Sequence, residues 1–185
     1  MRHSLAAIAA VMLAIGSAAC NADEAAVPAP RSVPAPDPAS APPVTLVSLA
    51  DLRASIPEFR GWSRGEVTAQ EGTDAQRSTQ VLTTFTRGSE KLELEIADTG
   101  GAPRAIESLE QMAGSTTNRT VGNGYFKGTM LGGFPAVESW NTVEKLGELS
   151  VLIRRRYIIH VAGSGLADAA PMRALAEAVD TSRLR

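Results

Sequence analysis

The chain is poor in the side chains that most often carry out chemistry in proteins. Its 185 residues include one cysteine and two histidines, the latter at positions 3 and 160. A single cysteine excludes an intramolecular disulfide and any zinc site that needs two thiolates from this chain. The 18 basic and 20 acidic residues leave a formal net charge of −2, so no basic excess favours binding to nucleic acid. We predict no metal site, no cofactor and no catalytic residue.

The first twenty residues have the layout of a bacterial export signal. A short basic start at residues 2–3 precedes an uncharged apolar run over residues 5–15, and small residues follow. Ala18-Ala19-Cys20 resembles the end of the lipobox of bacterial lipoproteins, although Ser17 stands where leucine is usual. The alternative is an ordinary secretory signal that is cut just before the cysteine. We predict a lipoprotein signal peptide over residues 1–19 and a lipid on Cys20 that anchors the chain in a membrane.

The residues after the cysteine predict the membrane and a tether. In enteric bacteria an aspartate directly after the lipidated cysteine favours the inner membrane. Asn21 therefore favours the outer membrane, with the inner membrane as the alternative. Residues 20–43 contain seven of the eleven prolines and almost no large apolar side chain. Such a segment cannot bury enough surface to fold, so we predict a semi-rigid spacer on the periplasmic side.

The remainder of the chain predicts one globular domain, and its first element is a short helix. Leu49, Leu52 and Ile56 recur at helical spacing, and Ser48 stands where a capping side chain is preferred. We expect a strand over residues 63–69 to follow.

A hairpin over residues 78–98 is the clearest local prediction. Gly88-Ser89 suits a two-residue turn with glycine at the first central position, as in a type II′ turn. Folding the chain there pairs Phe85 with Leu92 and places mostly apolar residues on one face of the hairpin and mostly polar residues on the other.

The second half of the domain predicts two further helices and two hairpins. We expect a helix over residues 103–113, then strands over residues 125–131 and 136–143 joined at Gly132-Gly133. Alternating apolar residues predict a hairpin over residues 148–163. The last helix follows it.

Two details of this half concern charge. Arg154, Arg155 and Arg156 fall at the turn of the 148–163 hairpin, so we expect them at an exposed tip. In the last helix, which Asp168 is expected to cap, Arg173 and Glu177 have the spacing of an i, i+4 ion pair.

The predicted order is helix, three strands, helix, four strands, helix, which indicates an α+β domain over residues 44–185. Ile56-Pro57 followed by Trp62, a polar hairpin, a helix and Gly133-Phe134-Pro135-Ala136 together resemble the Mog1/PsbP-like fold. The resemblance implies an antiparallel sheet of six or seven strands flanked by helices in an α/β/α sandwich. It also implies a role in protein binding or assembly rather than catalysis.

Few residues stand out as candidates for function. The arginines at positions 154–156 could contact anionic lipid or an acidic envelope protein, and Trp62 and Trp140 could be exposed contacts or core residues. His160 lies opposite Ser150 in the expected hairpin, where we interpret it as structural. We predict a non-catalytic binding or assembly module. The alternatives are a small-ligand carrier and a periplasmic enzyme without a recognisable motif; a cleft lined by polar groups would favour these.

Overall fold

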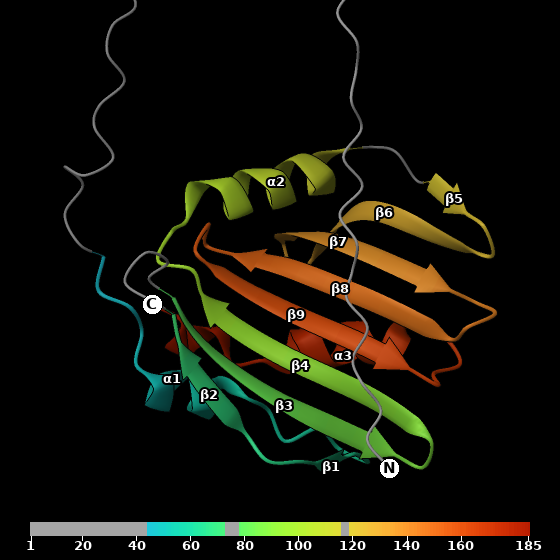
Figure 1. The fold of residues 1–185 in the computed structure, drawn as a ribbon, viewed down its shortest axis with the longest axis horizontal. Coiled ribbons are helices and arrows are strands. Elements are labelled where there is room, and N and C mark those ends of the chain that lie inside the picture. Colours follow the sequence, from blue (N-terminus) through green and yellow to red (C-terminus); the bar gives the residue numbers. More distant parts are fainter. Residues whose placement is uncertain (1–43, 73–77, 116–118) are drawn as a thin grey trace, which may run out of the picture. The chain divides into compact units, whose positions relative to one another are not determined.

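In the computed structural model, residues 44–72, 78–115 and 119–185 are described, and they form one antiparallel sheet with helices on both faces (Figure 1). The predicted signal peptide and most of the tether lie outside these residues. The helical elements are α1 (Leu49–Ser55), α2 (Pro103–Gly114), α3 (Ala170–Ala178) and the short 3-10 helix η2 (Thr181–Arg183). The strands are β1 (Ser63–Arg64), β2 (Thr68–Glu71), β3 (Thr79–Arg87), β4 (Glu90–Asp98), β5 (Arg119–Val121), β6 (Gly124–Leu131), β7 (Phe134–Asn141), β8 (Leu146–Ile153) and β9 (Tyr157–Ser164).

The strands are hydrogen-bonded in the order β1-β3-β4-β9-β8-β7-β6-β5, with β2 also paired to β3. The α+β class and the antiparallel sheet are therefore confirmed. The strand number is not, because the described residues form nine strands where six or seven were expected. The expected strand over residues 63–69 is two short strands, β1 and β2, which both pair with β3. β5 was not predicted, since its three residues are too few to show an alternating pattern in the sequence.

The hairpin of β3 and β4 has the predicted register. Phe85 pairs with Leu92, Thr83 with Leu94, and the turn is Gly88-Ser89. The φ angle of Gly88 is +61°, as the first central position of a type II′ turn requires.

The second hairpin also forms, with Ile153 opposite Tyr157 and residues 154–156 in the turn. Arg154 and Arg155 have φ angles of +51° and +53°, a left-handed conformation that usually selects glycine or asparagine. The turn therefore depends on the rest of the fold to hold two arginines in an unfavourable conformation.

The two faces of the sheet carry separate clusters of buried side chains. The larger cluster lies on the face that α1 and α3 cover, and it includes Leu52, Phe85 and Met172. The smaller cluster lies on the other face, under α2, where Ile106 and Leu109 pack near Val137 and Leu152.

Helix α2 packs on β6, β7 and β8, so it covers only part of that face of the sheet. Its last turn lies directly against Gly128 of β6: a Cβ atom there would be 2.4 Å from the carbonyl oxygen of Ala113 and 2.5 Å from that of Met112. Glycine thus permits the close approach of the helix. Within the described residues, no helix lies over the same face of β4 and β9 (Figure 1).

The final helix corrects two predictions. Asp168 accepts a hydrogen bond of 2.8 Å from the N–H of Ala170, but the helix begins at Ala170, so the cap position falls on Ala169, which makes no side-chain cap hydrogen bond. Arg173 pairs with Glu138 of β7 rather than with Glu177. A fully buried carboxylate gains more from the guanidinium than an exposed neighbour on the same helix does.

Candidate functional site

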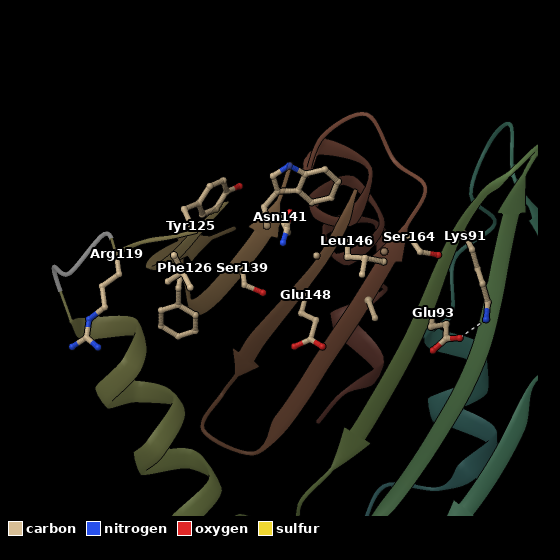
Figure 2. A pocket seen from close by; sticks show the side chains of 15 residues that line it. Lys91, Glu93, Arg119, Tyr125, Phe126, Ser139, Asn141, Leu146, Glu148 and Ser164 are labelled. Carbon is tan, nitrogen blue, oxygen red and sulfur yellow. Dashed lines mark hydrogen bonds and ion pairs between the residues drawn. The ribbon is translucent and has the colours of Figure 1, made fainter. Parts of the chain in front are cut away.

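The part of the sheet that α2 leaves uncovered contains a concavity of about 650 Å³. It extends across the strands from β5 to β4, beside the end of α2 (Figure 2). Side chains from alternate positions of these strands point into it, as the period of a β-strand requires. Figure 2 shows Arg119, Phe126, Glu148 and Glu93 on this side of the sheet, whereas the ring of Tyr125 points to the other side.

The strand register places the lining residues in rows across the sheet. One row contains Arg119, Phe126, Ser139, Glu148, Ala162 and Glu93 in spatial order. The neighbouring row contains Val121, Gly124, Asn141, Leu146, Ser164 and Lys91. Both rows mix small and large side chains: Gly124, Ser139, Ala162 and Ser164 lie between larger residues of the same rows.

Apolar side chains at this site are more exposed than folding alone favours. Leu146 is 45% exposed and Val121 is 61% exposed, and Phe126 is only partly buried. Burial of such side chains by a partner releases about 25 cal/mol per Å² of apolar surface. An apolar floor with polar groups at its border is typical of binding sites.

The charged groups of the concavity fall into two kinds. Lys91 and Glu93 form an ion pair with each other. Arg119 and Glu148 are exposed, and neither has an ion-pair partner among the described residues. The two unpaired charges have opposite sign and stand at different places along one row.

The predicted site residues lie elsewhere or face away. Cys20 is outside the described residues. Trp140 contributes to the lining of the concavity, but it is 95% buried and belongs to the large core cluster on the opposite face. Trp62 is half-buried, with its ring 5.8 Å from that of Phe59 and the guanidinium of Arg87 4.5 Å from its centre. Both tryptophans therefore act in packing.

The β8–β9 turn exposes Arg154 and Arg155, as expected, but Arg156 is half-buried, and all three arginines have partners within the domain. Arg154 donates to the carbonyl of Leu184, and Arg155 pairs with Glu110 at 3.2 Å. Arg156 binds the fully buried carboxylate of Asp98. The sequence pattern places charges at a turn, but it does not show which distant groups the folded chain brings to that turn.

Asp98 is fully buried at the end of β4, where it holds several segments together. It accepts hydrogen bonds from Arg156, from the N–H of Val47 at 2.7 Å and from the N–H of Gly100 at 2.9 Å. Burial alone would raise the pKa of Asp98, but these hydrogen bonds outweigh burial and hold the pKa below its ordinary value. Since Arg156 also donates to the carbonyl of Thr45, this cluster fixes the start of the domain.

Glu138, the second fully buried acid, lies on the α3 side of β7. It accepts hydrogen bonds from Arg173 and from the hydroxyl of Tyr125, and Lys127 lies 3.3 Å away. Burial would raise the pKa of Glu138, but its donors and the two cations hold it below the ordinary value. Burial and the neighbouring carboxylate raise the pKa of Tyr125 to about 12. This cluster is fully hydrogen-bonded and attaches α3 to the sheet.

His160 lies opposite Ser150, as the register predicted from the sequence requires. Its Nδ1 lies 3.0 Å from Oγ of Ser150, and Glu95 stands opposite it on β4. A serine beside a histidine can act as a nucleophile only if donors stabilise the oxyanion. Here β8, β9 and β4 each lie between two paired strands, so their backbone N–H groups are used within the sheet.

Two properties of the described residues bear on other classes of function. No three His, Cys, Asp or Glu side chains in residues 44–72, 78–115 and 119–185 lie close enough together to hold a metal ion. Within the same ranges, no helix has the length and apolar character needed to cross a membrane.

Sequence reasoning missed Arg119, Phe126, Leu146 and Glu148 as site residues. A signal was present at Phe126, which directly follows Tyr125, so that adjacent aromatic residues face opposite sides of β6. The expected hairpin began at residue 148, which left Leu146 out.

Comparison of the chain with protein-family models, with curated proteins and with solved structures gives no match.

Proposed function

We propose that the chain is a lipid-anchored, non-catalytic binding protein of the bacterial envelope, and that its partner occupies the concavity beside α2. The observation that carries this proposal is a hollow of about 650 Å³ with exposed apolar side chains on a sheet face that the fold leaves uncovered. Exposed apolar side chains add nothing to the stability of the fold, whereas a binding protein buries them against its partner.

The anchor belongs to the same proposal. A lipid on Cys20 would hold the domain at the outer membrane, and residues 21–43 would be the tether. The start of the domain at residues 45–47 is bound to Asp98 and Arg156, so the tether would leave the domain at a fixed place. Tethering raises the effective concentration of the domain near the membrane, which suits weak binding to another envelope component.

A Mog1/PsbP-like relationship is also part of the proposal. Its support is the presence of helices on both faces of one antiparallel sheet. The binding and assembly roles of that group agree with the surface described above.

A small-ligand carrier is the second candidate, since the volume of the concavity lies within the range of about 300–1,000 Å³ that small-molecule sites occupy. The Ser150–His160 pair gives less support to an enzyme because the neighbouring N–H groups are engaged in the sheet.

The test fills the concavity without touching the core. Ser139→Trp places a large ring over the middle of the hollow, and Gln80→Trp places the same ring on the same sheet face but outside it. Both full-length variants are expressed in cells, labelled with radioactive fatty acid and crosslinked with formaldehyde. We expect equal labelling, and loss of a discrete crosslinked product only with Ser139→Trp. Equal crosslinking in both variants would contradict binding in the concavity, and unlabelled wild type would contradict the anchor.

A further inference from the structure

We infer that the concavity takes an extended peptide segment with one acidic and one basic side chain four positions apart and an apolar side chain midway between them. This inference rests on the proposed function and names the chemistry of the partner at the same site.

Two unpaired charges of the concavity determine which charges the ligand carries. Arg119 and Glu148 are in one row, separated by β6 and β7. Three inter-strand spacings of about 4.8 Å put their positions about 14 Å apart. Neither has an ion-pair partner among the described residues, in contrast to Lys91 and Glu93, which neutralise each other. The ligand therefore needs a negative group near Arg119 and a positive group near Glu148.

The residues between these two charges determine the character of the middle of the ligand. Phe126 and Ser139 separate them within the row, and Leu146 is exposed in the next row. The middle of the ligand should therefore be apolar.

The spacing selects an extended chain. Residues i and i+4 of an extended peptide are about 13 Å apart. They share one face with residue i+2, because side chains alternate along a strand. One face of a five-residue segment thus offers an acid, an apolar residue and a base at the intervals that the concavity requires. An amphiphile, by contrast, has only one charged end, so its apolar end would lie against Arg119 or Glu148. Removing that side chain's charge from water without a partner is costly.

The probe is a dye-labelled, end-capped peptide of sequence Glu-Thr-Leu-Thr-Lys, titrated by fluorescence anisotropy against the full-length lipoprotein in phosphatidylcholine vesicles. The matched control peptide has glutamine in place of both charged residues. Because end caps remove the terminal charges, any difference between the two peptides comes from their side chains.

The variants reverse each charge of the site alone and together. We expect Arg119→Glu and Glu148→Lys each to weaken binding of the charged peptide about tenfold, as the change from attraction to repulsion at an exposed pair predicts. The double variant should recover most of the affinity, since the peptide can bind in the opposite direction. Arg60→Glu and Glu177→Lys reverse exposed charges elsewhere and should leave binding unchanged.

Several results would overturn the inference. Equal affinity for the neutral peptide, no recovery in the double variant, or no peptide binding at all would each exclude a ligand read by these two charges. Displacement of the peptide by palmitate with equal strength in wild type and Glu148→Lys would indicate an amphiphile carrier. The formaldehyde test with Ser139→Trp does not depend on the peptide, so loss of crosslinking there would keep the proposed function while the peptide class fails.

Discussion

Arg156 holds the buried carboxylate of Asp98 with two hydrogen bonds, 2.8 Å from Nε to Oδ1 and 2.6 Å from Nη2 to Oδ2. The two residues are 58 positions apart in the chain. Through the same guanidinium, which donates to the carbonyl of Thr45, the pair also fixes the first residues of the domain. A residue that the sequence pattern places at an exposed turn is thus a structural one.

The arginines of this turn should differ in their effect on stability. Arg156→Gln leaves a buried carboxylate without its cation, so the free energy of unfolding should fall by about 3 kcal/mol. Arg155→Gln breaks only an exposed pair with Glu110 and should cost about 0.5 kcal/mol. Urea unfolding of both variants measures the difference. Similar, small losses in both would show that Asp98 does not depend on Arg156.

The Gly88 turn should be sensitive to backbone conformation alone. A Cβ atom at Gly88 would meet no atom within 4 Å, but the φ angle of +61° is unfavourable for a β-branched residue. Gly88→Val should lower the free energy of unfolding by about 1–3 kcal/mol. Ser89→Ala serves as the control and should be nearly neutral. A neutral Gly88→Val variant in the same urea experiment would be evidence against the turn.

Local features of the fold could be predicted from the sequence because their causes are close together in the chain. Gly88 and the alternation on both sides of it determine the register of β3 and β4, and the paired apolar arms around Arg154–Arg156 determine that of β8 and β9. The short strand β5 at the sheet edge has no such pattern, since all three of its residues are exposed.

Features that depend on distant contacts could not be predicted in this way. The pairing of Arg173 with Glu138 rather than Glu177 depends on which acid becomes buried. The concavity depends on where α2 ends over the sheet, which in turn depends on the fit of its last turn against Gly128. No periodicity in the sequence reports that fit.

The contact between the last turn of α2 and Gly128 provides a further test. Gly128→Ala places a methyl group against the carbonyl oxygens of Met112 and Ala113, so the helix must move, and the free energy of unfolding should fall by about 2 kcal/mol. Gly114→Ala, with nothing within 4 Å of the added carbon, is the matched control and should not destabilise. Thermal unfolding measures the stability of both variants. Equal stability of Gly128→Ala and Gly114→Ala would mean that α2 does not pack directly on Gly128.

Acid should weaken the attachment of α3. The pKa of Glu138 is lower in the folded chain than in the unfolded one, so the unfolded state takes up protons first as the pH falls. The stabilisation from its charge is therefore complete above about pH 5 and is lost as the pH falls below about 4. Glutamine at position 138 cannot titrate. The free energy of unfolding of wild type should therefore fall relative to that of Glu138→Gln over that pH range. Parallel stability curves for the two proteins between pH 6 and 3, measured with urea, would exclude this role.

We propose that the concavity, rather than the arginine turn or the opposite face, is the binding surface. A photo-crosslinking amino acid placed at Leu146, at Arg155 or at Glu177 of the full-length chain samples these three exposed surfaces in intact cells. We predict a discrete crosslinked product from position 146 that disappears when Ser139→Trp is added, and none from positions 155 and 177. A product from position 155 or 177 with none from 146 would contradict the account.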